Sequence, residues 1–472
     1  MSLPAPRGRQ RDVLSMRTNG HIVVLGTAGS GKTTVAALRA QILADPRTPH
    51  TGKTLLVTYN KSLVTYLRSI AASELECVTV ETFHRFAFGY LRSRGLMRKI
   101  VRPSERARLV LSAMSESGLA NILRGKGIQS SSLKELLSNE FSIIARAALS
   151  REMYLASDQY RNRILVDAVG AGNIYDALEA YRKLRDESIE RYDFDDSLTA
   201  AWEAICNDGE HRLYKHIVID EGQDFAPVML KTLIAAIQPG GSVSFFGDVA
   251  QQIYGRETNW REAEFQVSKA EIFEENFRNT AEVIRLGSAI ARMPYYRSVQ
   301  DLIDPKSNAD AGPPPTLVRF ESVDVEVKWI CQQAINAVDT QNVAIICPAK
   351  HLAKKVSERF SKLREKRALL LDRGLARWYP ESKPRIYVST YHNAKGLEFG
   401  SVILAFTSSA EMPGSALERI YGEEEAATRA GTQFYVGVTR SRRNLLITYS
   451  GAVSALIPVN DQRPPLYTTL KP

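Results

Sequence analysis

The segment HIVVLGTAGSGKTTVAALRA near the start of the chain has the spacing of a phosphate-binding loop. It places Gly26, Gly31, Lys32 and Thr33 directly after an apolar run and before a helical pattern. Glycines let backbone N–H groups curl around phosphate oxygens, the lysine reaches the β and γ phosphates, and the hydroxyl binds Mg²⁺. We therefore predict a site for ATP and Mg²⁺, with Lys32 as a catalytic residue and Thr33 as a metal ligand. The loop residues expected to bind the nucleotide are Gly26, Thr27, Ala28, Gly29, Ser30, Gly31, Lys32, Thr33 and Thr34.

An acidic pair follows a second apolar run. HIVIDEGQDF places Asp220 and Glu221 where a strand would end. Acidic residues at such positions are often only caps, but a phosphate-binding loop requires a partner that holds the metal and activates water. We expect Asp220 to hold Mg²⁺ through water, and Glu221 to orient or deprotonate the attacking water.

Short apolar runs alternate with helical stretches along most of the chain, which is the pattern of parallel sheets covered by helices. The first set of predicted strands lies at 21–25, 54–58, 78–81, 216–220 and 242–246. The second set lies at 270–274, 316–320, 343–347, 385–390, 401–406 and 445–449. Between 99 and 205 the strand patterns give way to Leu, Ala, Arg and Glu at helical spacing. The predicted fold class is α/β, with two domains built on parallel sheets and a helical insertion in the first.

The composition fits a multidomain protein with a polyanionic partner. The chain has 472 residues, 44% of them hydrophobic, which supports more than one core. The net charge of +10 favours nucleic acid, although a basic balance alone can also be a solvated surface. Four cysteines without paired spacing lie beside apolar stretches where a small thiol would be buried, which argues against a zinc site or disulfides. We find no signal peptide or membrane-spanning run, so we expect a cytoplasmic protein without a membrane partner.

Several short segments occur in one order along the chain, namely DEGQD (220–224), GDVAQQIYG (247–255), ENFRN (275–279), STYHNAKGLEF (389–399) and YVGVTRSRR (435–443). In order and chemistry they resemble the motifs of superfamily 1 DNA helicases of the UvrD/Rep/PcrA group. The resemblance implies two RecA-like P-loop domains, ATP hydrolysis, and 3′ to 5′ movement on single-stranded DNA. It also implies a first domain at 1–98 and 206–269, a helical insertion at 99–205, a second domain at 270–452 and a C-terminal tail at 453–472.

The resemblance assigns nucleotide contacts outside the loop. Gln10 matches the glutamine that reads adenine, and Phe277 stands where the family stacks an aromatic ring on the base. Glu398 matches the carboxylate that meets the ribose. A solvent-exposed glutamine remains the alternative for Gln10.

Three further residues join the catalytic set through the same resemblance. Gln251 would sense the γ-phosphate, and Arg278 and Arg440 would act as arginine fingers from the second domain. Hydrolysis would then require the cleft between the domains to close. The alternative for each arginine is an ordinary surface salt bridge.

Contacts to a single strand are expected on loops at the opposite side of the two sheets, where aromatic rings stack on bases and hydroxyls or amides hold phosphates. The resemblance points to Tyr59, Asn60, Thr82, Phe83, His84, Tyr254, Arg256, Trp260, Thr390 and His392. An aromatic residue near a strand end is more often part of a core. Each assignment is therefore open by itself, while the whole set favours strand binding.

The sequence departs from the family pattern in two places. Arg256 stands where the family has a base-stacking tryptophan, with Trp260 four residues later, and a guanidinium plane can also stack. Only residues 350–384 separate two predicted strands where UvrD-type proteins insert an extra domain, called 2B. We expect that domain to be missing.

The compact size supports a second hypothesis. Small UvrD-like proteins of this shape resemble the helicase subunits of bacterial anti-phage systems such as Gabija. The chain would then be a nucleic-acid-sensing ATPase that regulates a partner, such as a nuclease, in defence or repair.

Two tracts in the helical insertion are harder to interpret. Residues 151–163 combine tyrosines and arginines, so they either touch nucleic acid or form a partly buried helix face. The acids of YDFDDS (192–197) are better explained as helix caps than as metal ligands.

Overall fold

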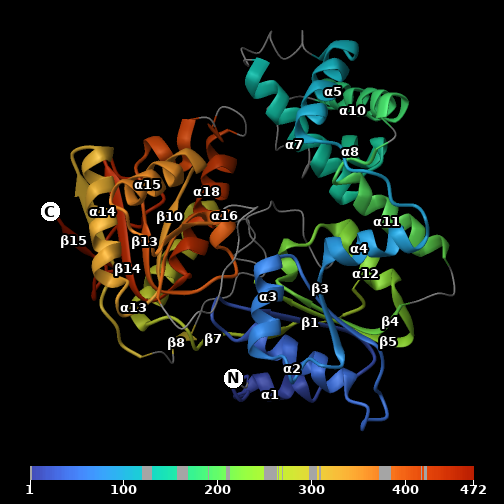
Figure 1. Ribbon diagram of the computed structural model, residues 1–472, viewed down its shortest axis with the longest axis horizontal. Coiled ribbons are helices and arrows are strands. Elements are labelled where there is room, and N and C mark those ends of the chain that lie inside the picture. Colours follow the sequence, from blue (N-terminus) through green and yellow to red (C-terminus); the bar gives the residue numbers. More distant parts are fainter. Residues whose placement is uncertain are drawn as a thin grey trace.

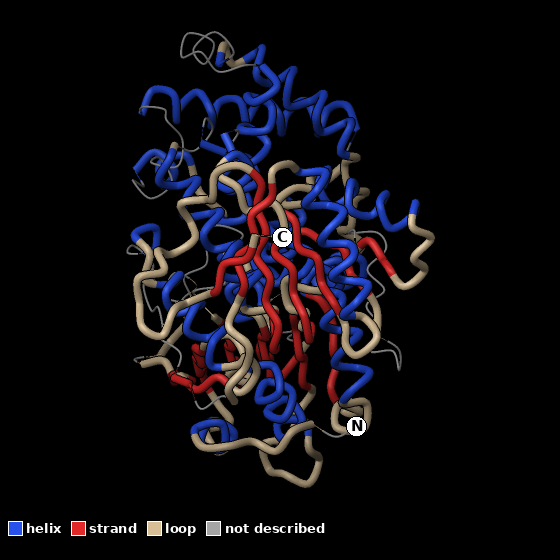
Figure 2. The backbone as a smooth tube through the Cα atoms, turned by 90° about the vertical axis from the view of Figure 1, so that its left-hand side faces the viewer, coloured by secondary structure: helices blue, strands red, loops and turns tan. Residues whose placement is uncertain are grey.

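The computed structural model describes residues 3–119, 130–156, 168–189, 191–208, 213–248, 263, 265–267, 269–296, 306–307, 310–371, 384–415, 417–418 and 422–471. Two α/β domains lie side by side, and a helical domain stands on the first of them (Figure 1). In the view turned by 90°, strands occupy the centre of the α/β part and the region above it is drawn as helices and loops (Figure 2). The predicted α/β fold class is confirmed.

The first α/β domain is built on a parallel sheet with the strand order β3-β2-β4-β5-β1-β6. Its strands are β1 (Gly20–Gly26), β2 (Thr54–Thr58), β3 (Val78–Thr82), β4 (Tyr214–Asp220), β5 (Ile237–Gly247) and β6 (Glu271–Phe273). The apolar runs of the central strands are buried on both faces, as a helix-covered parallel sheet requires. The assignment of the 270–274 strand to the second sheet is wrong. This strand is β6, and it pairs with β1 because Phe273 packs into the core of the first domain.

Helices cover both faces of the first sheet. One core contains side chains of α1 (Arg9–Leu14), α2 (Lys32–Ala44) and α3 (Lys61–Ile70). The other contains side chains of α4 (Phe83–Ser93), α11 (Asp196–Asn207) and α12 (Pro227–Ala235).

The second α/β domain has a parallel sheet with the order β11-β12-β10-β13-β14-β9-β15. Its strands are β9 (Thr316–Phe320), β10 (Val343–Cys347), β11 (Ala368–Leu370), β12 (Ile386–Thr390), β13 (Phe399–Leu404), β14 (Ser441–Ser450) and β15 (Thr468–Leu470). The three-residue strands β11 and β15 are too short to show a pattern in the sequence. The segment expected to be a separate tail contributes β15 to the edge of this sheet, beside β9.

The second sheet is also covered on both faces. Side chains of α14 (Val323–Ala337) and α15 (Lys350–Lys362) fill one core. Side chains of α13 (Ala281–Ala291), α16 (Tyr391–Ala394) and α18 (Glu423–Val438) fill the other.

The helical domain contains α5 (Pro103–Glu116), α7 (Ser130–Ala147), α8 (Arg151–Ala156) and α10 (Ala168–Ile189), which share one apolar core. The helical character predicted for 99–205 is therefore confirmed for its described residues. Tyr154 is fully buried and donates to Glu140 at 3.1 Å, so this tyrosine of the 151–163 tract belongs to the core. Residues 157–163 of that tract lie outside the described residues.

The acids of YDFDDS hold the helical domain to the first α/β domain. Asp193 accepts hydrogen bonds from Arg106 at 2.7 Å and Tyr181 at 3.0 Å, and Asp196 pairs with Arg185. Asp195 precedes α11 but its side chain makes no capping hydrogen bond. The capping interpretation is wrong for Asp193 and Asp196, because arginines of the helical domain bind these two carboxylates instead.

The remaining short elements are the strands β7 (Glu275–Asn276) and β8 (Lys306–Ser307), which pair with each other, and the turns η1 (Gly222–Asp224), η3 (Pro294–Tyr296) and η4 (Ala410–Gly414). Cys331 and Cys347 are buried, whereas Cys77 and Cys206 are exposed, so the expectation of packed thiols is wrong for the latter two. In the described part of the chain, no helix combines the length and hydropathy needed to cross a bilayer.

Candidate nucleotide site and strand-binding face

The phosphate-binding loop joins the end of β1 to the start of α2. Gly29 and Gly31 have φ values of 77° and 82°, which lie in the left-handed region that glycine tolerates best. A Cβ atom at Gly31 would lie 2.6 Å from Nε2 of Gln10, and one at Gly29 would collide with the side chain of Asn276. Both glycines are therefore required by backbone conformation and by close neighbours.

Lys32 lies inside this loop. Its Nζ donates to the carbonyl oxygens of Gly26 at 2.9 Å and Thr27 at 2.7 Å, and it is 3.8 Å from the carboxylate of Asp248. Burial lowers the pKa of Lys32, while Asp248 and Glu221 oppose this change. The ammonium group is thus placed where phosphate oxygens could replace the two carbonyls.

Several buried oxygen atoms beside Lys32 fit a phosphate and a divalent cation. The hydroxyls of Thr27 and Ser30, and both carboxylate oxygens of Asp220, accept or donate no hydrogen bond of normal geometry within the described chain. Burial and the charge of Glu221 raise the pKa of Asp220, and the nearby hydroxyl of Thr33 opposes this rise. Oxygen ligands of this kind suit Mg²⁺, whose charge would favour the ionised carboxylate.

Glu221 has a strained backbone, with φ 54° and ψ 41°. Non-glycine residues rarely adopt this conformation outside functional sites. Burial acts to raise the pKa of Glu221, but Lys395, Lys32 and Arg440 lower it below its usual value. Glu221 also accepts a hydrogen bond from Gln223. The carboxylate is therefore kept ionised, as a base that orients or deprotonates water requires.

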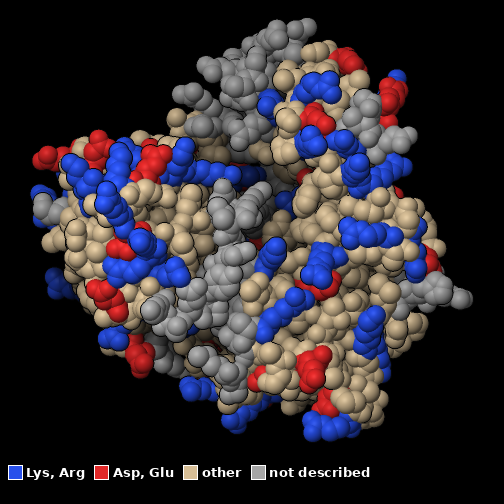
Figure 3. All heavy atoms as spheres, viewed as in Figure 1, with Lys and Arg blue, Asp and Glu red and all other residues tan. Residues whose placement is uncertain are grey.

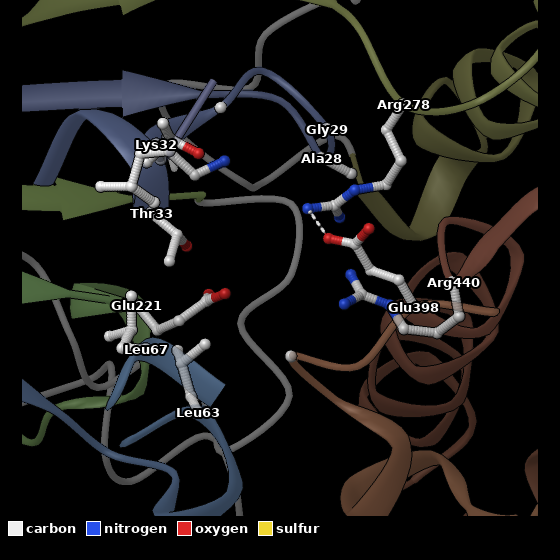
Figure 4. A pocket seen from close by; sticks show the side chains of 14 residues that line it. Ala28, Gly29, Lys32, Thr33, Leu63, Leu67, Glu221, Arg278, Glu398 and Arg440 are labelled. Atoms are coloured by element: carbon white, nitrogen blue, oxygen red, sulfur yellow. Dashed lines mark ion pairs between the residues drawn. The ribbon is translucent and has the colours of Figure 1, made fainter. Parts of the chain in front are cut away.

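The opposite wall of this cavity is formed by the second α/β domain and the segment that leads into it. Figure 4 shows Lys32, Thr33 and Glu221 on one side, facing Arg278, Glu398 and Arg440. The structure thus brings together predicted catalytic residues that lie far apart in the sequence.

Arg440 is almost completely buried at the end of α18. Its guanidinium donates to the carbonyl oxygens of Val436 at 3.0 Å and Leu397 at 3.3 Å. Burial and Arg278 lower the pKa of Arg440, while Glu221 and Glu398 oppose the change. This environment differs from that of a surface salt bridge, which was the alternative for this residue.

The carboxylate of Glu398 binds two arginine side chains. It forms an ion pair with Arg278 and accepts hydrogen bonds from Arg442 at 2.9 and 3.1 Å. Burial acts to raise the pKa of Glu398, but Arg278, Arg442 and Arg440 lower it. Contact with a ribose stays a prediction for Glu398.

A second cavity adjoins the loop. Its lining includes Gln10, Ser30 and Phe277. Gln10 donates to the carbonyl of Ser30 at 2.9 Å, and the backbone N–H of Phe277 donates to the carbonyl of Gly29 at 3.0 Å. The ring of Phe277 is 41% exposed, so it is accessible to a base. The two residues predicted to bind adenine therefore share one cavity beside the phosphate-binding loop.

The predicted strand contacts lie at the carboxyl ends of β2, β3 and β12. Because the strands of the first sheet are parallel, this is the same edge that carries the phosphate-binding loop and Glu221, so the expectation that these contacts lie at the opposite side of the sheets is wrong. Tyr59 follows β2, and its ring packs edge-on to His84 at 5.5 Å. Thr82 caps α4 by accepting from the N–H of Arg85. Thr390 is the N-cap of α16, within which His392 lies. On the face shown in Figure 3, a recess separates the second α/β domain from the helical domain, and lysine and arginine atoms are visible along its rim.

Phe83 does not fit the predicted set. Its side chain is completely buried and packs edge-on against Phe86 and Phe225. The prediction that Phe83 contacts the strand is wrong in this conformation, because the first turn of α4 directs the ring into the core. Gln251, Tyr254, Arg256 and Trp260 lie outside the described residues.

Comparisons with known proteins identify the family of the chain. A family model for the UvrD/REP helicase N-terminal domain matches residues 7–275, and one for the UvrD-like helicase C-terminal domain matches residues 369–452. The chain belongs to the UvrD-like helicases.

Curated relatives of this UvrD-like helicase are distant. A probable DNA helicase from Mycoplasma pneumoniae is 23% identical over 91% of this chain and 80% of its own length. The ATP-dependent DNA helicase UvrD2 of Mycobacterium tuberculosis is 24% identical over 65% of this chain, which spans 46% of the UvrD2 length. A solved C-terminal domain of a possible DNA helicase from a Lactobacillus shares 20% identity over 41% of this chain and 98% of its own, with a TM-score of 0.29 that supports no argument about fold.

Sequence reasoning missed several residues of this helicase that the structure places at the site. Lys395 pairs with Asp224, and Gln223 links Glu221 to the backbone N–H of Asp248 through a 2.9 Å hydrogen bond. These residues lie within or next to the helicase-like motifs, but only the folded structure shows that they contact one another. Phe194, 43% exposed and stacked on His84 at 4.8 Å, was also missed because YDFDDS was interpreted through its acids.

Proposed function

We propose that this chain is an ATP-driven motor that moves 3′ to 5′ along single-stranded DNA and separates the duplex ahead of it. Membership of the UvrD-like helicases supports ATP-dependent DNA helicase activity. The observation that carries the proposal is the cavity lined by Lys32 and Glu221 on one side and by Arg278 and Arg440 on the other. A site divided in this way is complete only when its two walls are close together.

The residues of the cavity have separate tasks in hydrolysis. Lys32 and the loop amides would bind the phosphates, and Arg278 and Arg440 would stabilise charge that develops on the γ-phosphoryl group. Glu221 would take the proton of the attacking water. Mg²⁺, held by Thr33 and Asp220, would supply neutralising charge beside the β and γ phosphates.

Strand movement follows from closure and opening of the cleft. Tyr59 and Asn60 belong to the first domain, while Thr390 and His392 belong to the second. If ATP draws the two walls together, these groups approach each other along the strand, and they separate after hydrolysis. Alternating grip by the two sets would convert this motion into directed steps.

The direction of movement rests on the UvrD-like form of HNAKGLEF and VTRSRR. The compact second domain favours a second candidate. Among the described residues, only α15 and β11 lie between β10 and β12, where larger relatives insert domain 2B. A compact chain of this kind could use its ATPase to regulate a bound partner, such as a nuclease, with little unwinding of its own.

An unwinding assay on the isolated chain separates the two candidates. Duplexes with a 3′ tail, a 5′ tail or no tail would be mixed with the chain, ATP and Mg²⁺, and strand release would be followed. The motor proposal predicts release from the 3′-tailed duplex only. Strand-stimulated ATP hydrolysis without release from any duplex would favour the regulatory candidate, and faster release from the 5′-tailed duplex would overturn the assigned polarity.

A further inference from the structure

We propose that Lys395 is a positioning residue that transmits strand binding to the catalytic carboxylate of Glu221. The inference rests on the proposed function, because it concerns how a bound strand stimulates ATP hydrolysis in the same cleft. Lys395 was not among the residues expected to bind nucleotide, metal or nucleic acid.

The first observation is a buried ion pair between the two α/β domains. The ammonium group of Lys395, directly after α16, pairs with the carboxylate of Asp224 in η1. The two side chains are 4% and 5% exposed. Removal of two charges from water is costly, and the cost is recovered only when the partners stay in close contact. The ion pair is therefore stable only while the two domains stay close together.

The second observation links the pair to the expected path of the strand. Asn60 donates from its side chain to the backbone carbonyl of Lys395 at 3.0 Å. Asn60 follows Tyr59 in the first domain, while Thr390 and His392 precede Lys395 by a few residues in the second. Residues expected to hold the strand thus adjoin Lys395 from both domains, so a change in their spacing would move it.

The third observation links the pair to the nucleotide cavity. Asp224 lies three residues after Glu221, on the same turn after β4. Gly396, which follows Lys395, lines the cavity together with Glu221 and Glu398. Displacement of Lys395 would therefore alter both the position and the electrostatic environment of the base.

A purely structural ion pair would behave differently from a coupling residue. Loss of a structural pair would lower stability and would affect hydrolysis equally with and without a strand. Loss of a coupling residue would reduce the ratio of strand-stimulated to strand-free turnover. This ratio is the decisive measurement.

The experiment measures ATP turnover by the full chain, with and without saturating oligothymidylate, for the parent, Lys395→Met and Lys395→Arg. We expect Lys395→Met to lower the stimulation ratio at least tenfold, and Lys395→Arg to keep it within threefold of the parent because the charge is retained. Lys354→Met is the matched control, since Lys354 is an exposed lysine on α15 of the same domain, and its ratio should equal that of the parent. A ratio within twofold of the parent in Lys395→Met would overturn the inference.

Asp224→Asn provides a second variant that preserves side-chain shape, and it replaces Lys395→Met if that variant does not fold. It should also lower the ratio at least tenfold, and the double variant should lose no more than the larger single loss. If the decrease in the ratio for the double variant equals the product of the two single decreases, the two residues act independently, which would contradict the inference. A parent without strand stimulation would refute the proposed function itself, whereas a stimulated parent with an unaffected Lys395→Met would refute only the role of Lys395.

Discussion

Arg278 and Glu398 form an ion pair at the wall of the nucleotide cavity that faces Lys32. The carboxylate fixes the guanidinium expected to contact the γ-phosphate. Replacement of Glu398 by Gln should therefore lower kcat about tenfold, a smaller loss than the roughly thousandfold expected when an arginine finger itself is removed. Arg442→Gln is the control, because Arg442 binds the same carboxylate from the exposed side, and it should change kcat less than threefold. An increase in KM for ATP with unchanged kcat would instead support the ribose contact predicted for Glu398.

Replacement of Lys32 by Ala, or of Glu221 by Gln, should abolish ATP hydrolysis while single-strand affinity changes little. The reason is that phosphates and strand are assigned to different parts of the domains. Glu221→Gln should still bind ATP, since only the base is removed. Hydrolysis and binding to a fluorescent oligonucleotide are measured on the same preparations, and near-normal turnover in either variant would disprove the assigned chemistry.

The positions of most strands and of the nucleotide loop were predictable from the sequence, because both depend on local patterns. Strand β6, which pairs with β1, was assigned to the second domain. Its short sequence EIF does not show that Phe273 belongs to the same core as Val24. Phe83 was assigned to the strand-binding face because an aromatic residue after a strand has the same spacing whether it faces solvent or core. Its ring packs against Phe225, which lies in a distant segment that the local pattern does not show. The pair between Lys395 and Asp224 was likewise unpredictable, because it depends on how two domains meet.

His84 should make stability depend on pH. Burial and the charge of Arg146 lower the pKa of His84 to about 4 from its usual 6.5. The unfolded chain therefore binds a proton at this residue between pH 6.5 and 4 that the folded chain does not. The contribution of His84 to the free energy of unfolding is complete above pH 6.5 and decreases as the pH falls toward 4. Because the side chain is partly exposed, the expected loss at pH 5 is roughly 1–2 kcal/mol.

Thermal unfolding of the parent and His84→Gln at pH 7.5 and pH 5 tests this expectation. The melting temperature of the parent should fall more than that of the variant over this interval. Equal decreases in the two proteins would show that His84 titrates normally in the folded state.

Affinity for single strands should fall steeply with salt and depend little on base sequence. Basic groups that contact several phosphates release counterions, with a slope of about 0.7 per contact on a double logarithmic plot. Titration of oligothymidylate and a mixed-sequence oligonucleotide between low and moderate ionic strength measures this slope. A flat response would contradict electrostatic binding along the strand.

The central claim is that Arg440, which is remote from Lys32 in sequence, completes the active site across the cleft. Arg440→Ala should lower strand-stimulated kcat by roughly a thousandfold with a much smaller change in ATP affinity, and Arg278→Ala should have the same kind of effect. Lys at either position should restore little activity, because an ammonium group cannot make the two-pronged contact of a guanidinium. The most direct test is steady-state ATP turnover by Arg440→Ala at saturating single-stranded DNA. A loss of that size is the predicted result, and turnover within about threefold of the parent would contradict the two-domain motor.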